Sequence, residues 1–212
     1  ALDHVWSTGP PIPTRSKGAP VPPTRRTRQQ PLSHGRIVAT ALGLLTRVGL
    51  PDLTMRAIGT ELGVQQSALY HHFANKQAML GAVADEILAR APRPSTPDDA
   101  PWQARVQERC TQLHAAVTAY PDGADLVMSM WAFGMGGQTP FDELSLMLRE
   151  AGISPAVAPT AARTLLHFVY GHAYDEQSHD VAARSGILTA EREPSMYRYA
   201  SSGMPVRVMR SL

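Results

Sequence analysis

The chain of 212 residues, 43% of them hydrophobic, is long enough for a small domain and a second, larger core, and its one cysteine, Cys110, excludes an intramolecular disulfide and fits a reducing cytoplasm. No apolar run approaches the ~18 residues of a membrane span and the N-terminal residues lack a signal peptide's apolar core, so we expect a cytoplasmic protein without membrane contact. The formal charge of +2 is unevenly divided along the chain. Residues 1–76 hold nine Lys and Arg against three Asp and Glu, and residues 77–212 hold eleven Lys and Arg against fifteen Asp and Glu. This split indicates a nucleic-acid-binding head followed by a second domain.

Residues 1–31 hold seven prolines and no helical period, so we expect a disordered arm. Its Arg25, Arg26 and Arg28 lie shortly before the first predicted helix. An arm with this charge could enter the DNA minor groove, as homeodomain arms do. A solvated linker is the other interpretation, and it is the more common one for such segments.

Apolar residues recur at helical spacing over residues 33–48 and predict a first helix. Gly49 and Pro51 end it, since both are helix-stop signals. Thr54 then suits the N-cap of a second, short helix, because a threonine hydroxyl accepts a backbone N–H group there. Residues 75–88 predict a longer apolar helix further along the chain.

Two short helices joined by a tight turn follow the predicted N-cap. The first has Ile58 and Leu62 one turn apart, and the second has Leu69 and Phe73 at the same spacing. Gly63 separates them, where a backbone with positive φ favours glycine. This pattern is typical of a helix-turn-helix, whose second helix enters the DNA major groove. The alternative is an amphipathic helix pair within some other all-α protein.

The second short helix carries Gln66, Ser67, Tyr70 and His71 on the sides away from its apolar pair. These side chains donate and accept hydrogen bonds, unlike the mixture of Glu, Lys and Arg on an ordinary solvated face. A glutamine amide can pair with both edge atoms of an adenine, and a serine with several bases. The composition of this face therefore favours DNA contact.

This region carries the pattern Thr54-x-Arg56-x-Ile58-x-x-x-Leu62-Gly63-Val64-x-x-x-x-Leu69-Tyr70-x-His72-Phe73-x-x-Lys76-x-x-Leu80. It resembles the DNA-binding domain of the TetR family of bacterial repressors, over residues 33–88. The resemblance implies that nine residues contact DNA: Thr54, Arg56, Gln66, Ser67, Ala68, Tyr70, His71, His72 and Lys76. The implied tasks are base contacts for Gln66, Ser67 and Ala68, a variable contact for His71, phosphate contacts for Tyr70 and His72, and further DNA contacts from Arg56 and Lys76.

Beyond a proline-rich linker at residues 91–97, the rear half has helical patterns and no strand pattern. Helices are expected over residues 102–120, 126–133, 140–151 and 156–179. The fold class is therefore all-α, with a helix-turn-helix domain over residues 32–78 and a larger helical bundle for effector binding and dimerisation over residues 79–212. Residues 185–212 are broken by glycine and proline, which leaves two interpretations open: dimerisation uses other helices, or residues are absent from this chain.

Two segments of the rear half are Tyr120-Pro121-Asp122-Gly123-Ala124 and His167-Phe168-x-x-Gly171-x-x-x-Asp175-Glu176-Gln177-x-His179. They are similar to the effector-binding core of tetracycline repressors, which implies a ligand pocket inside the bundle. Those repressors bind magnesium–tetracycline through a histidine shortly after the Asp-Gly-Ala turn, where this chain has Asp125, Leu126 and Val127, then Met128, and no histidine. Asp175 matches an acidic residue near that metal. One carboxylate without the imidazole is a poor chelate site, so we expect another effector and neither a bound metal nor a cofactor.

Methionine and aromatic residues gather in residues 128–135 and 168–174 and suit a pocket for a bulky, mainly apolar small molecule. The candidate ligand-binding residues are Met128, Trp131, Met135, Phe168, His172 and Asp175. The alternative for each is an ordinary core position. His172 lies one helical turn before Glu176, and we expect a local hydrogen bond there in preference to a metal pair.

These patterns predict a ligand-responsive repressor that binds a palindromic operator in double-stranded DNA as a homodimer and is released by a small-molecule effector. An activator of the same family is one alternative, and a protein that uses the helix-turn-helix only for packing is another. A helical enzyme using the rear-half histidines is a third, although the sequence has no Gly-x-Ser-x-Gly elbow, zinc-type His/Cys set or Walker loop. We therefore assign no catalytic residue.

Overall fold

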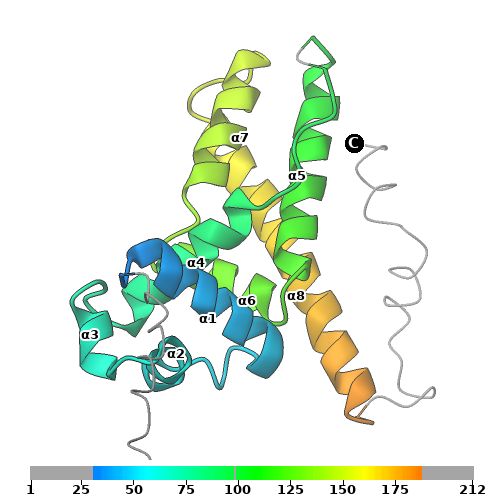
Figure 1. Cartoon of the computed structure of the whole chain (residues 1–212). Coiled ribbons are helices and arrows are strands. Elements are labelled where there is room, and N and C mark those ends of the chain that lie inside the picture. Colours follow the sequence, from blue (N-terminus) through cyan, green and yellow to red (C-terminus); the bar gives the residue numbers. More distant parts are fainter. Residues whose placement is uncertain (1–30, 98, 188–212) are drawn as a thin grey trace, which may run out of the picture. The chain divides into compact units, whose positions relative to one another are not determined.

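The computed structural model describes residues 31–97 and 99–187, and the regular secondary structure in these stretches is helical throughout (Figure 1). The predicted all-α fold class is confirmed. The helices are α1 (His34–Val48), α2 (Met55–Leu62), α3 (Gln66–Tyr70), α4 (Lys76–Ala89), α5 (Trp102–Thr118), α6 (Gly123–Ala132), α7 (Thr139–Glu150) and α8 (Ala158–Arg184). None of these described helices is long and apolar enough to cross a lipid bilayer. The predicted arginine-bearing arm and the segment after residue 187 lie outside the described residues.

The first helices begin and end where the sequence supplies caps. The Ser33 hydroxyl accepts the N–H of Arg36 at 3.3 Å, and the Thr54 hydroxyl accepts the N–H of Ala57 at 3.1 Å. Each bond satisfies an N–H group that has no partner within its own helix. Gly63 has φ 69°, in the left-handed region, and ends α2 before α3 begins. The predicted helix-turn-helix is thereby confirmed.

Helix α4 is buried along most of its surface because it has neighbours on several sides. It packs against α1 in the head and against α5 and α6 in the rear half. Its N-terminus is capped by Asn75, whose side-chain oxygen accepts the N–H of Ala78 at 2.7 Å. The predicted domain boundary between residues 78 and 79 falls in the first turn of this helix and stays a prediction.

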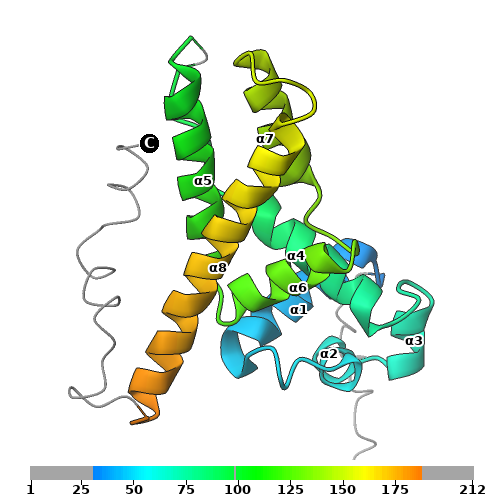
Figure 2. The same ribbon diagram turned by 180° about the vertical axis from the view of Figure 1, so that it is seen from behind.

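Helix α8 packs against α5, α6 and α7 and holds the rear half together (Figures 1 and 2). Its buried residues recur at helical spacing, and they are Ala158, Ala162, Leu166, Val169, Tyr170 and Ala173. The four predicted rear helices are all present with shifted ends. The largest shifts are that α6 begins at Gly123 instead of residue 126 and α8 runs to Arg184 instead of residue 179.

Cys110 of α5 is a buried side chain, with 2% of its surface exposed. Burial raises the pKa of its thiol to about 11, because the apolar surroundings disfavour the thiolate. The thiol is therefore protonated at neutral pH. Since the thiolate is the nucleophilic form, Cys110 is chemically inert in the folded protein.

Candidate DNA-binding surface and effector cavity

Helix α3 presents a polar surface on the sides away from its buried Leu69. Gln66, Ser67, Tyr70 and His71 are all exposed to solvent. In both views α3 stands at the edge of the ribbon (Figures 1 and 2). A short helix with exposed amide, hydroxyl and imidazole groups has the form that a DNA major groove accepts.

The other five predicted DNA-contacting residues come from α2, from α3 with the turn after it, and from the start of α4. Thr54 and Arg56 are exposed, whereas Ala68, His72 and Lys76 are half-buried. The Thr54 hydroxyl is occupied as the α2 cap. All nine side chains are thus at least partly accessible, and their contact with DNA stays a prediction.

Two contacts hold side chains of this surface in place. The Gln66 side-chain amide donates to the Tyr70 hydroxyl at 3.2 Å. The His34 ring lies 5.5 Å from the His72 ring and 4.5 Å from the Phe73 ring, measured between centroids. His34 was missed from the sequence because an exposed histidine at a helix start carries no pattern, and its neighbours come from another part of the chain.

Two long-range hydrogen bonds hold the segments at the two ends of α6 to earlier parts of the chain. The backbone N–H of Leu50, between α1 and α2, donates to the Asp122 carboxylate at 2.8 Å. The backbone N–H of Gly137, between α6 and α7, donates to the Asp85 carboxylate of α4 at 2.7 Å. Charged acceptors make such bonds stronger than neutral ones. The first bond joins the helix-turn-helix domain to the residue before α6, and the second joins α4 to the segment after α6.

Gly81 of α4 and Gly136, between α6 and α7, lie in backbone contact. A Cβ added to Gly81 would overlap the carbonyl oxygen of Met135, and one added to Gly136 would lie 2.6 Å from the carbonyl oxygen of Gly81. Glycine permits this approach because it has no side chain. The backbone of the segment after α6 therefore packs directly against the backbone of α4.

A cavity of about 550 Å³ lies between the C-terminal part of α4, residues 91–94, α5 and α7. Its volume is in the usual range of small-molecule sites. Its apolar lining includes Leu88, Ala89, Pro92, Pro140, Leu146 and Met147. These side chains suit the apolar part of a ligand.

The same cavity is lined by polar groups that the protein leaves unsatisfied. Gln112 is 5% exposed, and neither of its buried amide atoms has a hydrogen-bond partner. The Nε atom of Arg105 is also buried without one. Arg109 differs, because its guanidinium pairs with Glu143 at 2.6 Å. An unsatisfied buried group costs about 1–3 kcal/mol, so Gln112 and Arg105 are places where a ligand's polar group would be stabilised.

The predicted linker is held against α5 by Glu108. The Glu108 carboxylate accepts the backbone N–H and the hydroxyl of Ser95 at 2.5 and 2.6 Å. It also accepts the N–H of Thr96 at 3.0 Å. These bonds favour the charged form and lower the pKa of Glu108 to about 2. The linker segment that lines the cavity therefore has a fixed end.

We expect Glu108→Ala to loosen this end of the linker and to speed amide hydrogen exchange at residues 95 and 96. Because the folded pKa lies below the ordinary value of 4.5, the contribution of the bonds is present above pH 4.5 and is lost as the pH falls toward 2. Wild-type protection should fall over the same window. Glu150→Ala, which removes a carboxylate that lines the cavity, is the control, and equal protection in both variants would contradict the assignment.

The six residues predicted to bind a ligand lie on α6, α8 or the segment after α6, and they are Met128, Trp131, Met135, Phe168, His172 and Asp175. Trp131 is buried and packs edge-on to Tyr170, with ring centroids 6.1 Å apart. Met135 and Phe168 are 44% and 46% exposed. None of the six lines the cavity described above. Their part in effector binding stays a prediction.

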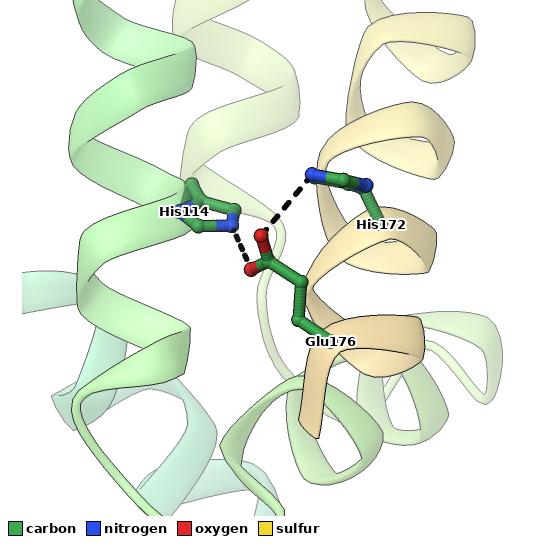
Figure 3. A group of neighbouring side chains, drawn as sticks. All are labelled: His114, His172 and Glu176. Atoms are coloured by element: carbon green, nitrogen blue, oxygen red, sulfur yellow. Dashed lines mark hydrogen bonds and ion pairs between the residues drawn. The ribbon is translucent and has the colours of Figure 1, made fainter. Parts of the chain in front are cut away.

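A further polar cluster joins α5 to α8 (Figure 3). Nε2 of His114 lies 2.7 Å from one Glu176 oxygen, and Nε2 of His172 lies 3.3 Å from the other. The local hydrogen bond predicted between His172 and Glu176 is wrong. The two groups are close, but the Nε2 atom of His172 is buried without a hydrogen-bond partner, so the approach lacks hydrogen-bond geometry. His114 was not foreseen, because it comes from a different helix.

Two family models match the chain. Residues 37–83 match the model described as bacterial regulatory proteins, tetR family, and residues 93–202 match the tetracyclin repressor-like C-terminal domain. The chain belongs to the TetR family. The tetracycline repressor protein class A from transposon 1721 of Escherichia coli is 34% identical over 164 residues, which are 77% of this chain and 76% of that repressor.

Solved structures of other TetR-like proteins are similar to this one. A crystal structure of BioQ with its natural double-stranded DNA operator has 40% identity and a TM-score of 0.65, and the match covers 74% of this chain and 93% of BioQ. BioQ from Mycobacterium smegmatis has 35% identity and a TM-score of 0.70, over 84% and 96% of the two chains. This TetR-family protein is therefore a repressor-like transcriptional regulator with a DNA-binding helix-turn-helix and a ligand-binding domain.

Proposed function

We propose that this TetR-family regulator represses transcription as a homodimer on a palindromic operator, and that a small molecule in the cavity of about 550 Å³ releases it. The proposal rests on the position of α4, which runs from the predicted DNA-contacting surface to the cavity. Its C-terminal part lines the cavity through Asp85, Leu88 and Ala89, and its first residue, Lys76, belongs to the predicted DNA-contacting set. One helix of 14 residues thus connects the ligand with the DNA contact.

Asp85 gives this connection a physical basis. Its carboxylate both lines the cavity and accepts the N–H of Gly137 from the segment that holds α4. A ligand that competes for this carboxylate would weaken the contact between α4 and that segment. To change operator affinity by 5–150-fold, the ligand must prefer the released conformation by about 1–3 kcal/mol.

The lining of the cavity defines the chemistry of the effector. The aliphatic and proline walls favour a mainly apolar molecule, as the sequence also predicts. The unpartnered Gln112 amide and Arg105 Nε add a requirement for at least one hydrogen-bond acceptor or anionic group. Binding such a group would remove a desolvation cost that the protein bears in its absence.

The homodimer is supported by the exposed side of α8. Phe168, Tyr174 and Val181 are exposed on this helix and lie close to seven-residue spacing. Apolar residues at that spacing form a stripe that packs against a second helix. Helix-turn-helix dimers read two half-sites about 34–36 Å apart, the separation of successive major grooves, and the two copies of α3 in the proposed homodimer would have to match that spacing.

The proposal is tested by sequencing the fragments of its own genome that the purified protein retains. A shared inverted repeat, bound by two chains in light-scattering measurements and progressively lost at higher salt, would support it. Fragments without a common repeat, or one chain per site, would contradict it.

Magnesium–tetracycline is expected not to release the recovered operator. The place of the metal-binding histidine implied by resemblance is taken by Asp125, Leu126 and Val127, then Met128, and Leu126 and Val127 are fully buried apolar residues. Titration of the protein–operator complex with the chelate measures the response, and the class A tetracycline repressor on its own operator is the positive control. Release at micromolar concentrations would show the prediction to be wrong.

A further inference from the structure

Three side chains with metal-binding donors converge between α5 and α8, apart from the DNA-binding surface and the cavity. They are His114, His172 and Glu176 (Figure 3). Each offers one donor atom, and the three donors lie within 4.8 Å of one another. Two of the residues share a face of α8 because they are one helical turn apart, and the third reaches across from α5.

The donor set and its spacing fit a transition-metal ion. Two imidazole nitrogens and one carboxylate oxygen are a common zinc ligand set that leaves a fourth position open. Tetrahedral bonds of about 2.0–2.1 Å place neighbouring donors about 3.3 Å apart. The Glu176 oxygens already lie 2.7 and 3.3 Å from the two Nε2 atoms. These two distances involve different oxygens of Glu176, and side-chain rotations would have to bring donors that now lie within 4.8 Å of one another to about 3.3 Å.

The surroundings hold these ligands in place. Gln177, next to Glu176, donates to the backbone carbonyl of Tyr120 at 2.7 Å and fixes α8 against the end of α5. The Phe168 ring stacks on the His172 ring with an interplanar angle of 6° and centroids 6.1 Å apart. Ligands positioned before the ion arrives lose less conformational entropy on binding it.

One atom of the cluster lacks a partner that an ion would supply. Nε2 of His172 is buried and forms no hydrogen bond. The three side chains are still 26–30% exposed, which leaves a path for an ion and a place for a water ligand. The cluster is distinct from the chelate site implied by resemblance, whose histidine position lies in the stretch that includes Val127.

We propose that the Nε2 atoms of His114 and His172 and the carboxylate of Glu176 bind one divalent transition-metal ion, zinc being the probe of choice, with a fourth position open to solvent. The bound ion cross-links α5 to α8. This assignment departs from the sequence-based expectation of no metal, which considered the chelate site implied by resemblance and the neighbours of His172 on its own helix. It is independent of the proposed repressor function, because binding requires neither DNA nor effector.

The experiment uses the full chain without an affinity tag, stripped with a chelator and titrated calorimetrically with Zn²⁺. One ion per chain and a rise in melting temperature with added Zn²⁺ are expected, since a ligand that binds the folded state stabilises it. Co²⁺ in place of Zn²⁺ should give the visible absorption of a four-coordinate site. Failure of the wild-type chain to bind either ion would overturn the proposal.

Three substitutions locate the site: His114→Ala, His172→Ala and Glu176→Gln. Each is expected to weaken Zn²⁺ binding at least tenfold, and Glu176→Gln keeps the size of the side chain should either alanine variant fail to fold. His167→Ala is the matched control, because that histidine lies on the same helix and packs on Trp131 instead. Cluster variants that bind like wild type, or a control that loses binding equally, would show that the ion binds elsewhere.

Discussion

Gln66→Ala is expected to weaken operator binding by about 1–3 kcal/mol and to relax the preference at one base position. Gln66 is exposed on α3, and its amide can pair with both edge atoms of an adenine. In the unbound protein this amide donates to the Tyr70 hydroxyl at 3.2 Å, a bond that must break for bidentate base pairing. Affinities for a set of operators that carry each base at each position measure the change.

Lys76→Ala provides the contrast to this base-specific effect. A lysine that contacts phosphate should strengthen binding to all sequences alike, so its removal should weaken all of them and lower the slope of log affinity against log salt by about one. Affinities measured at several salt concentrations separate the two behaviours. If both variants bound operator like wild type, the assignment of α3 as recognition helix would be wrong.

Gly81→Ala is expected to lower the free energy of unfolding by about 1–3 kcal/mol. The new Cβ would overlap the carbonyl oxygen of Met135, and a backbone atom cannot move aside as a side-chain tip can. Either α4 or the segment after α6 must shift. Because α4 also carries Lys76, operator affinity should fall in the folded protein as well. Urea denaturation and operator titration measure the two effects.

Gly43→Ala is the matched control. Gly43 is also inside a helix, α1, but a Cβ there has nothing within 4 Å. Glycine within a helix is less stable than alanine by about 0.5–1 kcal/mol, so this substitution should stabilise the protein. Opposite signs for the two variants are expected. Equal stabilities would mean that the backbone contact at Gly81 does not restrain α4.

The helix-turn-helix could be predicted because its signals are local. A cap at Thr54, a left-handed glycine at Gly63 and apolar pairs one turn apart all lie within a few residues of the features they specify. The start of α6 could not, because Asp122 adopts a positive φ of 56° while its carboxylate bonds to Leu50. That partner lies in a distant part of the sequence.

The cavity was missed for a related reason. Arg105, Gln112 and Glu143 are ordinary polar residues on helices, and a helical period shows which face is apolar without showing which polar side chain another helix covers. One residue of the methionine and aromatic pattern, Trp131, packs α6 on α8 through Tyr170. Long-range pairing, as between His114 and Glu176, leaves no trace in the spacing of either helix.

Because the Cys110 thiol is inert, an introduced cysteine in this protein can be labelled selectively. A cysteine introduced at an exposed position, such as Ser67→Cys on α3, would react with a maleimide at neutral pH while the native thiol stays protonated and covered. In the proposed homodimer, spin labels on the two introduced cysteines would report the distance between the two α3 helices by electron paramagnetic resonance. This distance is expected near 34–36 Å when the helices fit successive major grooves. Candidate effectors could then be screened by their influence on that spacing before any operator is known.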